Sequence, residues 1–66
     1  MAVIKIIEII GESEKSWEDA VHEGLKRAGK TVKNITGIDV LSFKAKIANN
    51  RIVQYRAHMK VAFVVE

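Results

Sequence analysis

Valine and isoleucine dominate the first part of the chain, residues 2–10, and this run ends at Gly11. Its length and its β-branched content predict a strand rather than a helix. Successive side chains of a strand point to opposite faces, and here both faces are apolar. Such a strand must be covered on both sides in the folded protein. One face carries Ile4, Ile6 and Ile10, and the other carries Val3, Ile7 and Ile9.

A helical pattern follows a turn at residues 11–15, and we predict one helix over residues 17–33 that ends at Asn34. Ser16 is a favourable N-cap, and Asp19 is placed to return a hydrogen bond to it, as in a capping box. Two acids in the first turn, and Lys30 and Lys33 in the last, suit the helix dipole. The apolar stripe, spaced by three and four residues, consists of Trp17, Ala20, Val21, Gly24, Leu25, Ala28 and Val32.

Gly24 lies in the middle of this stripe. A glycine inside a helix is less favourable than alanine by about 1 kcal/mol. Its position on the buried side therefore predicts a close approach between the helix and the backbone of a strand.

Two long segments, residues 35–48 and 51–65, are joined by Asn49 and Asn50. Asparagine tolerates the positive φ angles that a two-residue hairpin turn requires, so the two segments are predicted to form a β-hairpin. In the register set by a two-residue turn, Asp39 faces Lys60. We expect these two side chains to form a cross-strand ion pair.

The last strand alternates between an apolar face, which is expected to pack on the helix, and a polar face, which points away from it. The apolar residues are Val53, Tyr55, Ala57, Met59, Val61 and Phe63, and the polar ones are Gln54, Arg56, His58 and Lys60. The strand before it changes its pattern along its length. Its early residues Ile38 and Val40 belong to the helix side, whereas Leu41, Phe43, Ala45 and Ile47 fall on the opposite side unless a β-bulge alters the alternation.

These patterns predict an α+β domain, residues 1–66, in which one helix covers only one face of three strands. The second face keeps an apolar patch, which indicates an interface or a ligand site. A chain of 66 residues is close to the lower size limit for folding alone. Disulfides are excluded because the sequence has no cysteine, and two histidines are too few for a metal site of known spacing. Self-association is therefore the expected source of additional stability.

The net charge of +3 arises from eleven basic and eight acidic residues that are mixed along the chain. This balance does not resemble the basic patch of a nucleic-acid-binding protein. The longest apolar stretches are short and interrupted by charges, so no membrane span is expected. The start of the chain lacks the features of a signal peptide, and we expect a cytoplasmic location.

No group of residues has the pattern of a catalytic site, and we expect a protein that is not an enzyme. Ser16 is explained as a helix cap, and the glycine spacing matches no phosphate-binding loop. Arg56 could bind a phosphate or carboxylate, and His58 lies beside it on the polar face of the last strand. An acid-rich segment could attract a cation such as Ca²⁺, although it lacks the spacing of a calcium loop: Glu12, Glu14, Glu18 and Asp19.

The order of several short segments resembles the dodecin family over the whole chain. A strand ends in Ile9-Ile10-Gly11, and Ser13 and Ser16-Trp17 open a single helix that contains Arg27-Ala28 and is followed by Thr31-Val32. A long hairpin closes with Tyr55 and Lys60-Val61-Ala62-Phe63. The resemblance implies a β-α-β-β subunit whose three-stranded antiparallel sheet curls around the helix. It also implies a hollow homododecamer of cubic-type symmetry, which in flavin-binding members stores riboflavin, FMN or related flavins in pairs at subunit contacts.

Two positions depart from the flavin-binding pattern. Gly37 stands where those members have the tryptophan that stacks on the isoalloxazine ring, and Arg56 stands where they have a glutamine. These differences favour the branch of the family that lacks the tryptophan, part of which is associated with calcium. Two functions follow: a shell that stores a small ligand, with flavin as the family ligand, or a shell without flavin that has a structural or calcium-binding role. The family pocket corresponds to Gly37, Ser42, Arg56 and His58, and no metal-binding residue is assigned.

Overall fold

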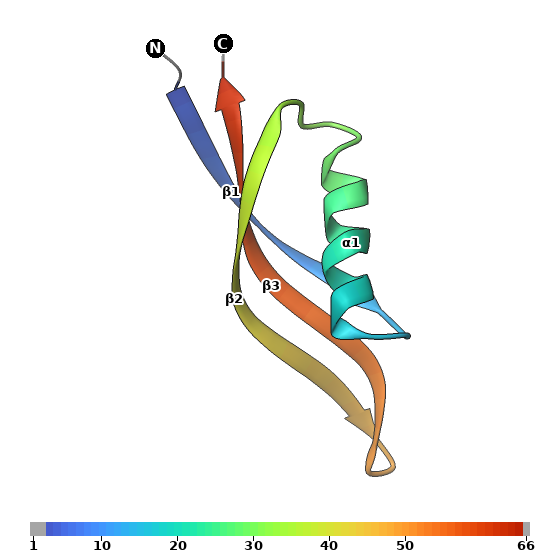
Figure 1. Ribbon diagram of the computed structural model, residues 1–66. Helices are drawn as coiled ribbons and strands as arrows, with labels where there is room; N and C mark the ends of the chain where they lie inside the picture. Colours follow the sequence, from blue (N-terminus) through green and yellow to red (C-terminus); the bar gives the residue numbers. More distant parts are fainter. Residues whose placement is uncertain (1–2, 66) are drawn as a thin grey trace.

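The computed structural model describes residues 3–65, which form one helix and one antiparallel sheet of three strands (Figure 1). The elements along the chain are β1 (Val3–Ser13), α1 (Trp17–Ala28), β2 (Ile35–Ala48) and β3 (Arg51–Val65). The sheet order is β1-β3-β2, so β3 is central and the outer strands are its two neighbours. This arrangement confirms the predicted α+β fold with its β-α-β-β order. Among residues 3–65, no helix is long and apolar enough to cross a membrane.

The hairpin between β2 and β3 has the predicted bounds and the predicted turn. Asn49 and Asn50 have φ angles of 53° and 60°, which fit a two-residue turn with both central residues in the left-handed region. The register pairs Asp39 with Lys60, as expected. The predicted ion pair is not formed, however. The salt bridges found over residues 3–65 do not include these two side chains.

Two predicted boundaries were wrong. β1 does not end at Ile10 but continues to Ser13, because the long central strand β3 offers pairing partners as far as Tyr55. The helix ends at Ala28 rather than near Lys33, and Lys26 and Arg27 are the basic residues of its last turn. Gly29 caps it by donating its N–H to the carbonyl of Leu25 at 2.8 Å. The following residues lead back to the sheet. The part of the first predicted strand at Ala2 lies outside the described residues.

The start of the helix is capped by Ser16, as predicted, through a 2.9 Å hydrogen bond from the Asp19 N–H to the Ser16 hydroxyl. Asp19 does not return a bond to Ser16. Its carboxylate instead accepts a 2.6 Å hydrogen bond from the Ser13 hydroxyl, which also accepts one from the Lys15 N–H. The end of β1 and the start of α1 are therefore tied together by side chains in a tight connection.

The core lies between α1 and the sheet face that it covers, which we call the helix face. Gly24 of the helix approaches β1 closely, as predicted, so that a β-carbon built on it would lie 3.3 Å from the Gly11 α-carbon. Small residues thus allow the helix to lie directly on the strand. The fully buried side chains are Ala20, Ala57, Met59 and Val61.

A bulge in β2 overturns part of the predicted pattern. Val40 pairs with Met59, but Ser42, and not Leu41, pairs with His58. The extra residue shifts the alternation by one position. Phe43 pairs with Ala57 and Ala45 with Tyr55, so both point to the helix face rather than to the opposite one. Leu41 occupies the bulge itself, and Ile47 pairs with Ile52 beyond a further irregularity near the turn.

The subunit is elongated, with principal dimensions of 51 × 20 × 13 Å. Its radius of gyration is 13.4 Å, whereas a compact domain of this length has about 11 Å. Its accessible surface is 5038 Å², against about 4,200 Å² for a typical monomer of this mass. The helix packs on β1 and β3 and leaves the outer half of the hairpin uncovered (Figure 1). The chain therefore exposes more surface than a self-contained domain of its size.

Candidate functional site

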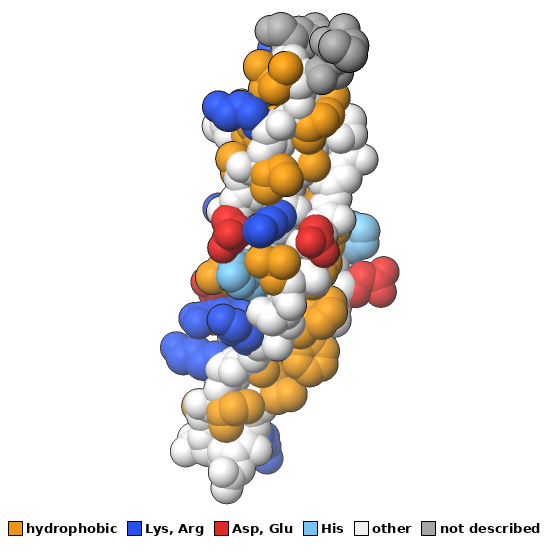
Figure 2. Space-filling view, turned by 90° about the vertical axis from the view of Figure 1, so that its left-hand side faces the viewer, with side chains coloured by type: hydrophobic (Ala, Val, Ile, Leu, Met, Phe, Trp, Pro, Cys, Tyr) orange, Lys and Arg blue, Asp and Glu red, His pale blue; other side chains and the backbone are white. Residues whose placement is uncertain are grey.

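The sheet face opposite the helix, which we call the open face, carries the polar residues that were predicted to form a site. Figure 2 shows charged side chains across its middle, with hydrophobic groups on either side. Residues that share this face form three rows across the strands in the order β1, β3, β2. The rows are Glu8–Lys60–Asp39, Ile10–His58–Ser42 and Glu12–Arg56–Lys44.

His58 lies near the centre of the open face and is about one-quarter exposed. Its Nε2 atom is 2.7 Å from a carboxylate oxygen of Glu8, one row away on β1. Ser42 is the cross-strand neighbour of His58 on the other side. The Glu8 carboxylate fixes the orientation of the imidazole ring, so His58 presents a constrained polar group beside the Ser42 hydroxyl.

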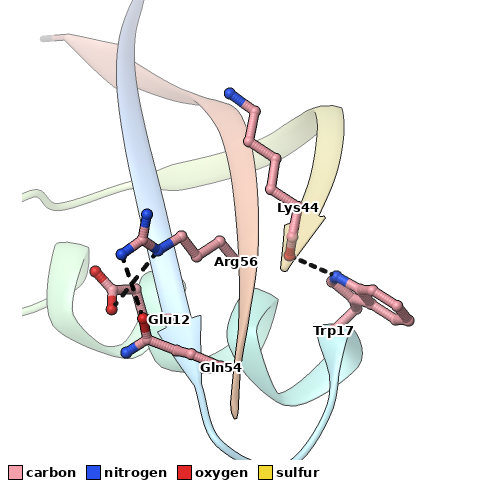
Figure 3. Close-up of polar contacts among 5 residues, drawn as sticks. All are labelled: Glu12, Trp17, Lys44, Gln54 and Arg56. Carbon is pink, nitrogen blue, oxygen red and sulfur yellow. Dashed lines mark hydrogen bonds and ion pairs between the residues drawn. The ribbon is translucent and has the colours of Figure 1, made fainter. Parts of the chain in front are cut away.

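Arg56 is held between two acceptors. Its Nε atom is 4.0 Å from a Glu12 carboxylate oxygen, and its Nη2 atom donates a 3.3 Å hydrogen bond to the Gln54 side chain (Figure 3). The Nε atom itself is buried and has no hydrogen-bond partner. Lys44 is the cross-strand neighbour of Arg56 on β2 and brings a second positive charge to the same row. This row can bind an anionic oxygen, because guanidinium and ammonium groups both donate to phosphate and carboxylate.

Three of the four predicted pocket residues are therefore neighbours on the open face. Ser42 and His58 face each other, and Arg56 is the next residue on the same side of β3. Gly37 is not close to them, since it pairs with Ala62, roughly 13 Å along β3 from His58. The charged row that includes Lys60 lies between. Gly37 instead lines a small hollow of about 200 Å³, and a β-carbon there would meet no atom within 4 Å.

The open face offers no ring for a flavin to stack on. The four aromatic residues of the chain all belong to the helix side. Trp17 contacts Tyr55 and Phe43 edge-on, with ring centroids 4.8 and 6.3 Å apart, and donates a hydrogen bond to the Lys44 carbonyl (Figure 3). Phe63 shares the face of buried Val61. The residues present therefore do not fit a stacked isoalloxazine ring, although the donors of the Arg56 row fit an anionic group.

Sequence reasoning missed two of the groups that shape this surface. Lys44 was missed because it lies beside Arg56 only as a result of the bulge at Leu41. This bulge has no clear signature in the sequence. Glu8 was treated only as one of the charges that interrupt the apolar stretches. Its alternation with Ile6 and Ile10 on one side of a strand was the signal that could have placed it next to His58.

The acid-rich segment does not form a metal site within one subunit. Glu12 points to the open face, whereas Asp19 bonds to Ser13 and Glu18 lies 3.8 Å from His22 on the outer side of the helix. Within residues 3–65, no three or more acidic or histidine side chains gather in a way that could hold a metal ion.

Comparison with known proteins identifies relatives over nearly the whole length of the chain. The family model described as Dodecin matches residues 3–66. A protein named calcium dodecin from Mycobacterium tuberculosis is 35% identical over 63 residues, which are 96% of this chain and 89% of that protein. A protein named dodecin from Thermus thermophilus is 30% identical over 64 residues, 97% of this chain and 93% of that protein.

A solved structure supports the same assignment. The crystal structure of the M. tuberculosis calcium dodecin, whose description names a novel calcium-binding site, aligns with a TM-score of 0.85 at 33% identity. The alignment covers 97% of this chain and 91% of that one. The match in sequence extends over both the helix and the hairpin, and the match in structure over the same elements. The chain is thus a member of the dodecin family.

Proposed function

We propose that this protein is a non-enzymatic binding and storage protein that works as a dodecin-type shell of twelve identical subunits. The observation that carries the proposal is the amount of large apolar side chain that one subunit leaves exposed. Ile6 is 60% exposed, Ile47 57% and Phe43 55%, and they lie on three different parts of the sheet. Isolated apolar residues are common on protein surfaces, but several over one thin subunit indicate contact surfaces.

The proposed ligand is a small anion or a molecule with an anionic group, bound at a subunit contact over Ser42, Arg56 and His58. Arg56 and Lys44 supply the positive charge, and Ser42 supplies a hydroxyl that donates or accepts a hydrogen bond. Ser42, His58 and Glu8 lie in neighbouring rows, but within residues 3–65 no hydrogen bond joins the Ser42 hydroxyl to His58, so the contact between nucleophile and base that a catalytic site needs is not formed. Flavin, the ligand expected from the family, would bind here through a phosphate rather than through stacking of its ring.

The assembly is tested by sedimentation velocity and native mass spectrometry on dilute protein. A closed particle of twelve 7.4 kDa subunits supports the proposal. A well-folded 7.4 kDa particle at micromolar concentration contradicts it, because exposed surface of this kind would then need no partner.

The ligand is tested by equilibrium dialysis with FMN, riboflavin and inorganic phosphate. FMN is expected to bind more tightly than riboflavin, and phosphate is expected to compete with it. The matched variants Arg56→Gln and Arg56→Lys separate loss of charge from loss of the guanidinium shape. Equal binding of riboflavin and FMN, or no binding of either, contradicts an anion site at Arg56.

A calcium-dependent shell is the second candidate, and it is supported by the 35% identity to a relative named calcium dodecin. In this version, carboxylates such as Glu8 and Asp39 of the open face would join those of a neighbouring subunit around the ion. Oxygen ligands of this type suit Ca²⁺. A thermal melt with and without a calcium chelator tests it, since an unchanged midpoint argues against a structural ion.

A further inference from the structure

The free end of the hairpin extends beyond the rest of the fold. β1 ends at Ser13, opposite Tyr55, so residues 46–54 form a ribbon of only two strands, which we call the arm (Figure 1). It exposes three branched apolar side chains, Ile47, Ile52 and Val53, at 57%, 44% and 42%. A two-stranded ribbon is marginally stable in water unless it packs on something. Within this subunit the helix does not reach it.

The charged side chains of the arm are all positive. It contains Lys46 and Arg51 and no acid, and the whole stretch from residue 40 to residue 65 has five lysines or arginines and no acid. Two arms that packed on each other would bring like charges together, which disfavours a symmetric arm-to-arm contact. A surface that accepts the arm should be apolar and should carry acids.

One part of the subunit has this character. The stretch from residue 8 to residue 23 carries six acids and one base. Within it, a cleft of about 520 Å³ opens between α1 and the unpaired edge of β1. Its lining includes the apolar residues Ile9, Ile10 and Ala28 and the charged residues Glu12, Glu23 and Arg27. Glu12 is engaged by Arg56 at 4.0 Å, so Glu23 is the acid on the helix side of the cleft that an incoming base can pair with.

We infer that the arm of each subunit docks into the cleft between α1 and β1 of the next subunit. Ile47 and Ile52, which pair across the arm and share one of its faces, cover the apolar side chains of the cleft, and Lys46 or Arg51 approaches Glu23. The two contact surfaces differ, so the contact is heterologous and generates a ring where its rotation closes. A twelve-subunit shell of cubic-type symmetry contains threefold axes, around which such a ring fits. The inference rests on the proposed assembly and specifies one of its contacts.

A disulfide experiment tests the contact, because the sequence has no cysteine of its own. Ala48→Cys places a thiol on the arm, and Arg27→Cys places one in the cleft. Ala48 is about 20 Å along the hairpin from the Gly11–Ala57 pair at its own cleft. A disulfide needs α-carbons within about 7 Å, so any bond between these positions joins two subunits.

The double variant A48C/R27C is expected to give a ladder of linked subunits on a non-reducing gel after mild oxidation. A48C/K26C is the matched control, since Lys26 lies on the exposed side of the helix, and it is expected to stay unlinked. A48C alone is expected to stay monomeric on the gel. A dimer from A48C alone means that arms meet each other and overturns the inference. The inference is also overturned if A48C/R27C assembles into the shell, as its native mass shows, but stays unlinked both after oxidation and after treatment with a short bismaleimide.

A charge exchange gives a second, independent readout. K46E/R51E and E23K are each expected to raise the protein concentration for half-assembly at least about tenfold, because like charges then face each other. The combined variant K46E/R51E/E23K should recover assembly, whereas E18K, a matched reversal on the outer side of α1, should leave it unchanged. If the wild type is monomeric, the proposed shell fails; if the wild type assembles and these variants assemble equally well, only the docking contact fails.

Discussion

Gly11 of β1 and Gly24 of α1 face each other, and a β-carbon added at either position would collide with a neighbouring group. A β-carbon on Gly11 would lie 3.2 Å from the Gly24 α-carbon and would collide with the backbone carbonyl of Ala20. A β-carbon on Gly24 would collide instead with the methyl end of the Met59 side chain. The two positions therefore differ in whether the obstacle can move.

We predict that Gly11→Ala destabilises the fold by about 3 kcal/mol, since a helix carbonyl cannot move without shifting the helix. Gly24→Ala is expected to stay within about 1 kcal/mol of the wild type, because Met59 is flexible and alanine favours the helix. Urea unfolding at one fixed protein concentration measures both. Gly37→Ala, at an open position, serves as the control and should be neutral. Equal losses for Gly11→Ala and Gly24→Ala would contradict this account of the contact.

Ser16→Ala should cost about 1 kcal/mol of stability, because it removes the hydroxyl that accepts the Asp19 N–H at the start of α1. Ser42→Ala is the matched control on the open face, where the loss of a hydroxyl uncaps no helix. Thermal unfolding of the two variants at the same concentration makes the comparison. A cap role for Ser16 would be refuted by equal midpoints.

The hairpin could be predicted from the sequence to the residue, because two signals agreed. Asn49 and Asn50 marked the turn, and the alternation of apolar and polar residues marked the strand that follows it. The packing of Gly24 on β1 was predicted for a similar reason, since a glycine on the apolar stripe of a helix is favoured where another backbone comes close. These features depend on local chemistry, which a single sequence displays.

The features that could not be predicted depend on pairing. The bulge at Leu41 moved Phe43 and Ala45 to the sheet face opposite to the predicted one. No proline or glycine at that position indicates a bulge in the sequence. β1 was extended past Gly11 by the partners that β3 offers, which are distant in sequence. For the candidate site, the family resemblance gave Ser42, Arg56 and His58 together with Gly37, which lies apart, and the bulge in β2 is what places Ser42 beside His58. The contact of Glu8 with His58 required the register of β1 on β3.

Ile6→Ser distinguishes a free subunit from an assembled one. Ile6 is 60% exposed on the open face, so in an isolated subunit its replacement should change stability by less than about 0.5 kcal/mol. If a neighbouring subunit covers it, burial of an isoleucine contributes about 1.5–3 kcal/mol, and that stabilisation is lost. We expect the larger effect in a thermal melt, together with a higher concentration for half-assembly. Ile6→Val retains most of the apolar area and should behave like the wild type.

Gly37→Trp is expected to increase the affinity for FMN and riboflavin about tenfold or more. Gly37 opens onto a hollow and adds no ring to the open face, whereas flavin-binding members of the family are expected to stack a tryptophan there. Each aromatic contact contributes about 0.5–1.5 kcal/mol beyond its burial, and two subunits would each supply one.

Fluorescence quenching of riboflavin measures this gain, since a stacked ring loses its emission. Gly37→Leu adds apolar area at the same position without a π system and should raise the affinity much less. A tryptophan variant that remains assembled but leaves riboflavin fully fluorescent would mean that subunits do not meet over Gly37. In that case the site at Arg56 would be the remaining ligand position on the open face, and its preference for FMN over riboflavin would be unaffected by the variant.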